Sequence, residues 1–239
     1  MSETIYLSVV IPVYNEEKRL GPTLDAVKDF LKKQPYTSEI IVADDGSMDE
    51  SLKVARAKLE GFPHQIVQNP VNIGKGAAVK RGMLAAHGSI RLFSDADLST
   101  PIEEVSKFIQ HHEAGCDVVI GSRALAASNV TQRQNPLREA MGRVFNKIAR
   151  SLAFEGIQDS QCGFKSFKRR AAMDLFGLQK LNGFSFDAEI VYLAQVRGYK
   201  ILESPVTWVN DTQSRVRLFR DPLLMFHDLL RIRRLHRDL

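Results

Sequence analysis

The chain has 239 residues, of which 44% are hydrophobic and 26% are charged, a composition typical of a soluble globular protein with a sizeable core. Two cysteines, Cys116 and Cys162, are too few for a disulfide framework and favour a reducing compartment. There is no apolar run of about 18 residues, and we expect neither a signal peptide nor a membrane span.

The net charge of +5 is unevenly distributed along the chain. Residues 1–120 contain 13 Lys and Arg against 17 Asp and Glu, whereas residues 121–239 contain 20 against 11. The basic second half is either a solvated face or the binding surface for an anionic partner, which could be a phosphate, a nucleic acid or a lipid headgroup.

The first half alternates apolar runs with amphipathic stretches. The runs expected to be strands are 7–13, 39–43, 65–68, 90–94 and 117–121. They are rich in Val and Ile without strict alternation, as in parallel strands that are buried on both faces. This order predicts an α/β fold with a mostly parallel central sheet flanked by helices.

Helix signals separate these runs. Apolar residues recur at spacings of three and four from Leu20 to Leu31. Residues 47–50 (Ser-Met-Asp-Glu) predict a capping box before a second helix. Residues 100–103 (Thr-Pro-Ile-Glu) predict an N-cap followed by Pro at the first helical position.

The second half is less regular. We expect a helix over 138–154, with an apolar stripe that includes Val144, a short strand over 163–167 and a helix over 185–197 that ends at Gly198. Residues 200–209 are expected to be extended, and 221–237 form a final basic helix. No internal repeat or linker interrupts the sequence, so we expect one domain.

Polar residues follow four of the expected strands. They lie at 12–17, at Asp44 and Asp45, at 69–76 and at Asp95 and Asp97. Parallel strands bring such loops to one sheet edge, where ligands bind. Two carboxylates one residue apart suit Mg²⁺ or Mn²⁺ that carries a phosphate. Taken singly, 44–47 also fits a turn with a helix cap and 74–76 a flexible turn, and neither matches a P-loop or dinucleotide fingerprint.

The ordered set of motifs resembles the family 2 inverting glycosyltransferases with the GT-A fold. The motifs 119–123 (VIGSR), 161–165 (QCGFK) and 186–189 (FDAE) are similar to those of the branch that contains dolichyl-phosphate glucosyltransferases and mannosyltransferases. The spacing from Trp208 to Arg215 is more similar to the glucosyl type. Two departures are Arg215, where the family usually has Lys, and the N-terminal membrane anchor of the eukaryotic glucosyl enzymes, which this sequence does not show.

The resemblance implies a division of a single Rossmann-like domain, with a nucleotide-sugar-binding half (1–122), an acceptor-binding half (123–214) and a basic amphipathic C-terminal helix (215–239). The residues expected at the nucleotide sugar are Pro12, Tyr14, Asn15, Glu16, Asp44, Asp45, Gly74, Lys75, Ala96 and Arg215. The expected metal contacts are Asp95, Asp97 and Ser99, where a hydroxyl or a water would replace the Gln often found in the mannosyl branch.

On the acceptor side, the resemblance implies a lipid monophosphate, which is anionic and needs no strong general base. Arg123 and Arg138 match the family's phosphate-binding arginines, and a guanidinium fork suits phosphate. Arg138 could also be a solvated helix residue. Asp187 and Glu189 could contact the sugar or the acceptor, or could only cap a helix. Gln161 is a candidate acceptor residue, whereas Cys162 is expected to be packed rather than nucleophilic.

The expected activity is metal-dependent, inverting transfer of a hexose, most readily glucose from UDP-glucose, to a polyprenyl or dolichyl monophosphate. The alternatives are GDP-mannose as donor, a soluble hydroxyl acceptor, and a non-enzymatic basic module that binds membranes or nucleic acid. We expect no nucleic-acid partner, because no aromatic stacking platform is present. The C-terminal helix either packs on the domain or lies on anionic lipid, and the expected location is the cytoplasmic face of a membrane.

Overall fold

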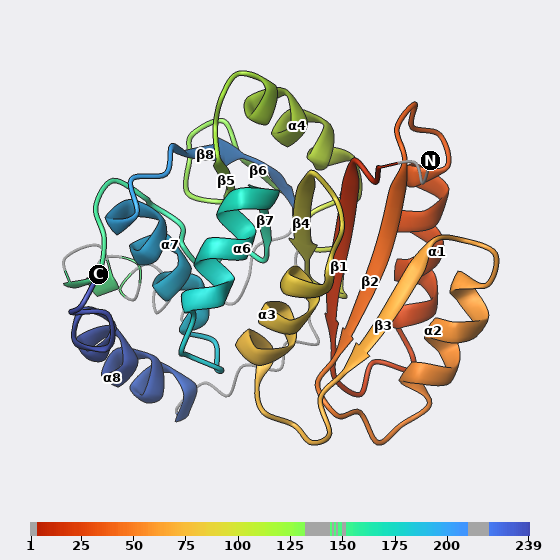
Figure 1. Cartoon of the computed structure of the whole chain (residues 1–239), viewed down its shortest axis with the longest axis horizontal. Coiled ribbons are helices and arrows are strands. Elements are labelled where there is room, and N and C mark those ends of the chain that lie inside the picture. The colour runs from red at the N-terminus through yellow and green to blue at the C-terminus, as the bar shows by residue number, and fades with distance from the viewer. Residues whose placement is uncertain (1–3, 132–143, 145, 147, 150–151, 210–219) are drawn as a thin grey trace.

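A central sheet organises the chain (Figure 1). The computed structural model describes residues 4–131, 144, 146, 148–149, 152–209 and 220–239. Within them the sheet order is β3-β2-β1-β4-β7-β5-β8. The strands are β1 (Leu7–Val13), β2 (Ser38–Asp44), β3 (His64–Gln68), β4 (Ile90–Ser94), β5 (Val118–Ser122), β7 (Phe164–Lys168) and β8 (Ile201–Pro205).

Strand directions agree with the mostly parallel sheet that the sequence predicts. β1 is parallel to β2 and β4, β2 is parallel to β3, and β5 is parallel to β8. β7 is antiparallel to both of its neighbours and lies between β4 and β5. Two short strands, β6 (Asn129–Val130) and β9 (Thr207–Trp208), pair separately from this sheet.

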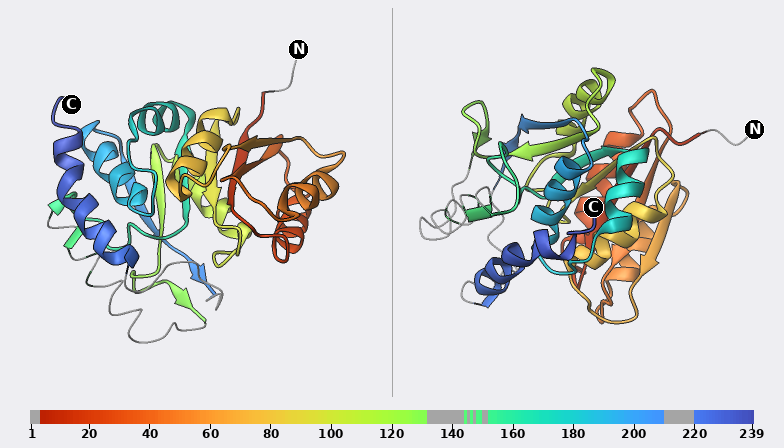
Figure 2. Two further views of the ribbon diagram at one scale, coloured as in Figure 1. Left: turned by 90° about the horizontal axis from the view of Figure 1, so that it is seen from below. Right: turned by 60° about the vertical axis from the view of Figure 1, so that its left-hand side comes forward.

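Helices cover both faces of the sheet (Figure 2). They are α1 (Leu20–Leu31), α2 (Ser51–Leu59), α3 (Lys75–Ala85), the 3₁₀ helix η1 (Ile102–Glu104), α4 (Val105–Glu113), α6 (Arg169–Leu178), α7 (Phe186–Val196) and α8 (Arg220–Leu235). Successive strand residues point to opposite faces. Val10 belongs to the core cluster that contains residues of α3, α6 and α7, whereas Val9 belongs to the cluster that contains residues of α1, α2 and α4.

Two expected helix starts are wrong. The box over 47–50 does not form, because α2 begins at Ser51 and its N-cap, Glu50, makes no side-chain cap bond. The Ser47 hydroxyl instead accepts the backbone N–H of Asn15 at 2.9 Å, which joins the β1 and β2 loops. Pro101 stands before the first residue of η1 rather than inside it, and no side-chain cap bond forms there.

The helix expected over 138–154 lies largely outside the described residues. Its described members 144, 146, 148, 149 and 152 are helical, whereas 153 and 154, which were also expected in the helix, are not. Ala149 is buried, and Ile148 and Leu152 pack against the core. The apolar stripe that the sequence predicts includes Val144, but its side chain is 57% exposed, so this part of the prediction is wrong.

Candidate active site

The carboxyl ends of β1, β2, β3 and β4 lie at one edge of the sheet, because these strands are parallel. Asp95 follows β4 at this edge, and Lys75 opens α3. The Lys75 Nζ atom lies 2.6 Å from Asp95 Oδ1. The structure therefore brings together two of the residues that the sequence assigned to the donor site.

Asp97 completes an acidic turn with Asp95. Its Oδ1 atom accepts the backbone N–H of Ser99 at 2.9 Å. Burial and the neighbouring charge of Asp95 raise the pKa of Asp97 above its ordinary value, which is the response expected of two carboxylates in one partly desolvated site. A cation placed between them would relieve this repulsion.

Gly163 shapes the same turn from the chain segment before β7. Its carbonyl accepts the Asp95 backbone N–H at 3.1 Å. A Cβ atom at position 163 would lie 1.9 Å from Asp95 Oδ2. Only glycine therefore leaves the Asp95 carboxylate in its present position.

Asp45 organises the loop between β3 and α3. This buried carboxylate accepts four hydrogen bonds, from the side chains of Asn69 (2.8 Å) and Asn72 (2.9 Å) and from the backbone N–H groups of Ile73 (3.0 Å) and Gly74 (2.8 Å). The loop leads directly into Lys75. Asp45 thus holds the donor-side loop in shape, and direct contact between Asp45 and a nucleotide remains a prediction.

The loops after β1 and β2 are joined to each other. Asp44 is buried, and its Oδ2 atom accepts the backbone N–H groups of Gly46 and Ser47, each at 3.1 Å. Asn15 has a left-handed φ of 51°, and its Oδ1 atom accepts the Met48 backbone N–H at 2.8 Å. Glu16 pairs with Arg19, whose Nη2 atom lies 2.7 Å from Glu16 Oε1.

The remaining donor-side positions predicted from the sequence flank this edge. Pro12 is in β1, and Tyr14 lies just beyond that strand. The Ala96 carbonyl accepts the Thr23 hydroxyl at 2.6 Å, which ties the acidic turn to α1.

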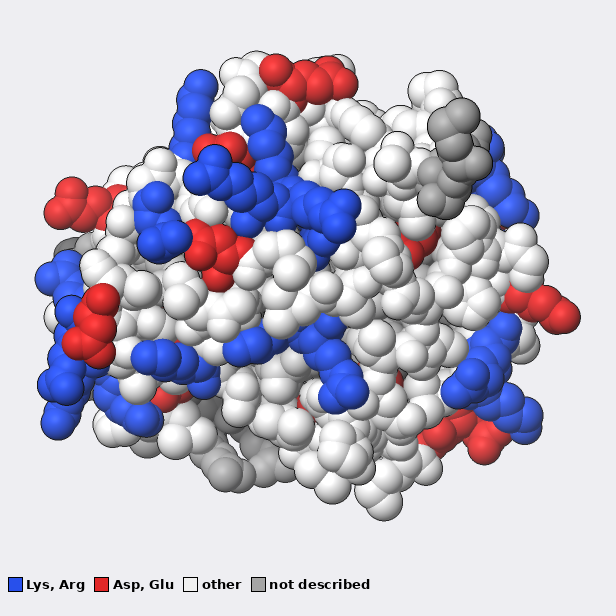
Figure 3. All heavy atoms as spheres, in the orientation of Figure 1, with Lys and Arg blue, Asp and Glu red and all other residues white. Residues whose placement is uncertain are grey.

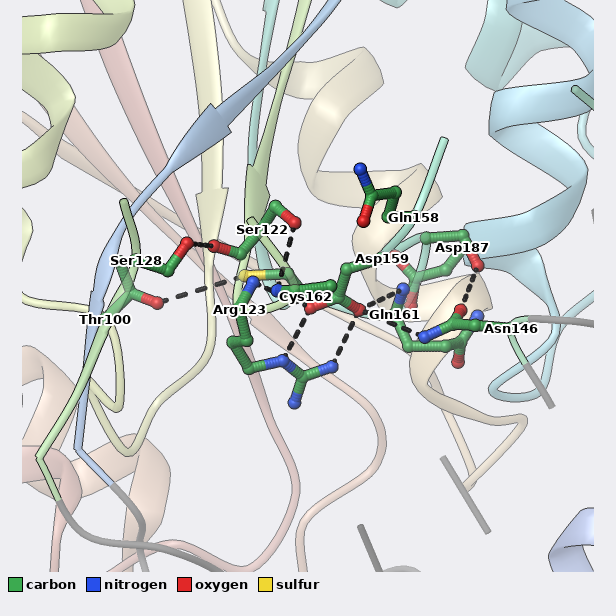
Figure 4. Close-up of polar contacts among 12 residues, drawn as sticks. Thr100, Ser122, Arg123, Ser128, Asn146, Gln158, Asp159, Gln161, Cys162 and Asp187 are labelled. Atoms are coloured by element: carbon green, nitrogen blue, oxygen red, sulfur yellow. Dashed lines mark hydrogen bonds and ion pairs between the residues drawn. The ribbon is translucent and has the colours of Figure 1, made fainter. Parts of the chain in front are cut away.

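Arg123, directly after β5, forms a two-pronged ion pair with Asp159 (Figure 4). Its Nε and Nη2 atoms donate to the Asp159 carboxylate at 2.7 and 2.8 Å, and its backbone N–H donates at 3.0 Å. The guanidinium also lies 5.5 Å from the centre of the Trp208 ring. Burial alone would raise the pKa of Asp159, but the Arg123 charge lowers it to about 2.

Asp159 was missed by the sequence analysis. It is a single acid in a polar loop, and its proximity to the VIGSR and QCGFK motifs was the only available signal. Beside it, Cys162 is 1% exposed, and burial followed by the charge of Asp159 raises the pKa of its thiol to about 11. The expectation that Cys162 is packed rather than nucleophilic agrees with this environment.

Asp187 faces the site from the first turn of α7, as part of a buried pair with Lys165. The Lys165 ammonium contacts Asp187, donates to the Cys162 carbonyl at 2.6 Å and lies 5.2 Å from the centre of the Phe93 ring. Burial raises the pKa of Asp187, and the charges of Lys165 and Lys75 act in the opposite direction. Asp187 is thus an interior acid tied to a lysine, not a simple helix cap.

Two of the predicted site residues cannot be placed, and the findings on metal sites and membrane spans concern only the described part of the chain. Arg138 and Arg215 lie outside the described residues. Among the residues that are described, no three His, Cys, Asp or Glu side chains are grouped to hold a metal ion. In the same part of the chain, no helix is both long and apolar enough to cross a membrane.

Comparison with solved structures shows the same fold. The glucosyl-3-phosphoglycerate synthase of Mycobacterium tuberculosis, crystallised with Mn²⁺, UDP and glucosyl-3-phosphoglycerate, aligns with a TM-score of 0.69 at 20% identity, over 95% of this chain and 78% of the synthase. The mannosyl-3-phosphoglycerate synthase of Rubrobacter xylanophilus aligns with a TM-score of 0.69 at 19% identity, over 98% and 75%. The predicted GT-A type fold is thereby confirmed.

Sequence relatives give the family. The dolichyl-phosphate beta-glucosyltransferase of Dictyostelium discoideum is 35% identical over 97% of this chain and 75% of its own length. The human protein of the same name is 34% identical over 97% and 76%. The model of glycosyl transferase family 2 matches residues 8–176. The chain therefore belongs to glycosyl transferase family 2 and is a glycosyltransferase related to the dolichyl-phosphate beta-glucosyltransferases.

Proposed function

We propose that this glycosyltransferase transfers glucose from UDP-glucose to a polyprenyl or dolichyl monophosphate with inversion, giving a β-linked lipid phosphosugar. One structural observation supports this proposal above all. The sheet edge has an acidic pair with a lysine at the end of β4, and a carboxylate-held arginine at the end of β5. Two differently charged subsites suit a reaction between two phosphate-bearing substrates.

The donor subsite contains Asp95, Asp97 and Lys75. Carboxylate oxygens suit Mg²⁺ or Mn²⁺, and the raised pKa of Asp97 indicates a site that favours added positive charge. Two carboxylates, with Ser99 as a further candidate, leave coordination positions for diphosphate oxygens and water. When bound, the cation would neutralise the charge that develops on the leaving diphosphate. Lys75 would contact the donor beside it.

The acceptor subsite contains Arg123. Asp159 occupies the Nε and Nη2 atoms of this guanidinium and fixes its plane, and within the described residues Nη1 has no hydrogen-bond partner. Nη1 can therefore bind an acceptor phosphate whose oxygen attacks the anomeric carbon from the face opposite the diphosphate. The C1–O bond to UDP then breaks, and UDP leaves with the electron pair. No proton transfer is needed, because the attacking oxygen is already anionic.

The contact of α8 with membranes is part of the same proposal. Its solvent side carries large apolar side chains at Leu224, Phe226 and Leu230, together with exposed Arg231, Arg233 and Arg234. On the face of the molecule shown in Figure 3, Lys and Arg side chains gather where α6, α7 and α8 lie in Figure 1. A mixed apolar and basic surface suits an anionic bilayer. Both cysteines are free, which favours the cytoplasmic face.

Binding and transfer assays test the proposal together. UDP-glucose with Mn²⁺ or Mg²⁺ should raise the melting temperature more than GDP-mannose does, since a ligand of the native state stabilises it by mass action. Labelled glucose should appear on dolichyl phosphate, and EDTA should stop the transfer. Asp97→Asn should abolish it, whereas Asp29→Asn, an exposed carboxylate on α1, should not. Preferential transfer from GDP-mannose, or to a soluble hydroxyl acceptor, would replace this proposal with one of the alternatives.

A further inference from the structure

His236 lies far from the acidic turn in sequence but is linked to it through buried contacts. It follows α8, and its side chain is 1% exposed. Its Nε2 atom lies 2.6 Å from Oε1 of Glu189 in α7, whose side chain is fully buried. The imidazole thus supplies a hydrogen bond to a carboxylate that water does not reach.

The Glu189 carboxylate also binds the backbone of the segment between α6 and α7. Its Oε1 atom accepts the Lys180 N–H at 2.8 Å, and its Oε2 atom accepts the Leu181 N–H at 2.9 Å. Three donors therefore converge on one buried carboxylate. A buried carboxylate that loses one of its donors carries an uncompensated desolvation cost, so we expect the whole group to relax when His236 is removed.

The segment between α6 and α7 is hydrogen-bonded in turn to the start of α3. The Asn182 carbonyl accepts the Ala77 N–H at 3.2 Å. The Gln179 Nε2 atom donates to the Gly76 carbonyl at 2.9 Å and to the Leu181 carbonyl at 2.8 Å. The fit is close, because a Cβ atom on Gly76 would lie 2.8 Å from the Leu181 carbonyl oxygen. Any shift of the segment therefore moves the first turn of α3, where Lys75 lies.

We propose that His236 is a positioning residue for the donor site: through Glu189 and the 179–182 segment, it sets the place of Lys75 against Asp95. This inference rests on the proposed nucleotide-sugar donor for its kinetic consequences. The contacts that link His236 to α3 do not depend on which donor is bound. A displacement of about 1 Å in a site residue can cost a large factor in kcat/KM, so a modest relaxation at α7 suffices to weaken use of the donor.

Three variants separate positioning from bulk stability. His236→Ala removes the donor to Glu189, His236→Gln keeps an amide donor near the position of Nε2, and Arg237→Ala changes the neighbouring exposed residue. In His236→Ala the KM for UDP-glucose should rise about tenfold, with kcat at saturating donor and the KM for lipid phosphate within about twofold of wild type. His236→Gln should restore most of the loss, and Arg237→Ala should show none.

A double-mutant cycle identifies the route. If His236 acts through Lys75, His236→Ala should weaken donor binding in the wild-type background but add little to Lys75→Ala. Equal effects of His236→Ala in both backgrounds would overturn the inference, and so would a lowered melting temperature with unchanged donor binding. If His236→Ala does not fold, His236→Gln and Gln179→Ala replace it. Donor binding that is retained in His236→Gln but weakened in Gln179→Ala supports the route. Unchanged donor binding in Gln179→Ala refutes it.

Hydrogen exchange without ligand tests the structural part on its own. The amide of Ala77 should exchange faster in His236→Ala than in wild type, and His236→Gln should slow it again. Unchanged Ala77 exchange would overturn the inference even if the donor proposal holds. Conversely, a wild-type protein that binds no nucleotide sugar would refute the proposed function, while the exchange data would still decide the link from His236 to α3.

Discussion

Lys75 Nζ and Asp95 Oδ1 are 2.6 Å apart, and they join the first turn of α3 to the end of β4. Asp97 lies beside this pair with a raised pKa. One lysine thus offsets part of the charge of two carboxylates. The balance leaves a net negative site that can accept a divalent cation while a positive group stays available for the donor.

Replacing Lys75 by Met should move the acid limb of the pH–rate profile to higher pH. Lys75 lowers the pKa of Asp97, although burial and Asp95 dominate and raise it, so its removal raises that pKa further. The ionised form needed for cation binding is then lost at a higher pH as the solution is acidified. Donor affinity should fall about tenfold or more. A profile of kcat/KM against pH checks this, with Lys53→Met on the exposed face of α2 as the control. An unmoved acid limb would contradict the charge balance.

Gly163→Ala should reduce activity much more than stability. The new Cβ atom would lie 1.9 Å from Asp95 Oδ2, so the carboxylate must move out of its present position. We expect kcat/KM to drop by a factor of about ten to a hundred. Gly177→Ala is the matched control, because an added Cβ there meets no described heavy atom within 4 Å, and Ala in a helix stabilises by about 0.5–1 kcal/mol. Comparable activities of the two variants would show that Asp95 tolerates displacement.

Asp159→Asn should remove a pH-dependent part of the stability. The pKa of Asp159 is lowered from 3.8 to about 2 by Arg123 against the opposing effect of burial. A lowered native pKa stabilises the fold above the unfolded value of 3.8, and this stabilisation is lost as the pH falls toward 2. The pair should contribute about 2 kcal/mol to the free energy of unfolding at neutral pH by this linkage.

Urea unfolding between pH 2 and pH 6 measures this effect. At neutral pH, Asp159→Asn should lower the free energy of unfolding by about 2 kcal/mol, because the half-buried guanidinium of Arg123 loses its charged partner. The gap to wild type should narrow as the pH approaches 2. Asp238→Asn, at an acid whose side chain is 91% exposed, should leave the curve unchanged. A gap that stays constant with pH would mean that the pair does not titrate as described.

Phe226→Asp and Leu230→Asp should weaken binding to anionic vesicles. Each puts a charge in place of an exposed apolar side chain of α8, and apolar burial together with cationic attraction drives interfacial binding. Co-sedimentation with phosphatidylserine-containing vesicles measures the loss. Met48→Asp, at a side chain that is 90% exposed on the loop before α2, is the control. UDP-glucose binding without lipid should be unaffected by the two α8 changes, and retained vesicle binding would rule out this face.

The strands and the donor-side loops could be predicted because each depends on local pattern. β1 and β4 have the bounds that their apolar runs indicate. β3 begins one residue earlier than expected, β2 is one residue longer at each end, and β5 is shifted by one residue toward the C-terminus. Polar residues at the ends of parallel strands must meet at one edge, so Lys75 and Asp95 could be assigned to one site before their distance was known.

Features that depend on distant contacts could not be predicted in this way. The pattern of 163–167 indicates a strand, but it does not show that β7 runs antiparallel between β4 and β5. Glu189 ends the FDAE motif, but its partner His236 lies 47 residues further along the chain and belongs to no motif. Asp159 meets Arg123 across 36 residues. The Ser47 hydroxyl accepts the distant backbone N–H of Asn15 instead of the N–H of a nearby helix turn that a capping box would use.

The insertion of β7 determines how far apart the two charged subsites lie. Adjacent strands are about 4.8 Å apart, so the ends of β4 and β5 are separated by roughly twice that distance. If β4 and β5 were neighbours, Arg123 would lie next to the acidic turn and would add a second positive charge to the one that Lys75 already brings to Asp95. The intervening strand therefore spaces the acidic turn and Arg123 along one edge of the sheet, so that a cation-attracting and an anion-attracting group both remain within reach of the same reactants.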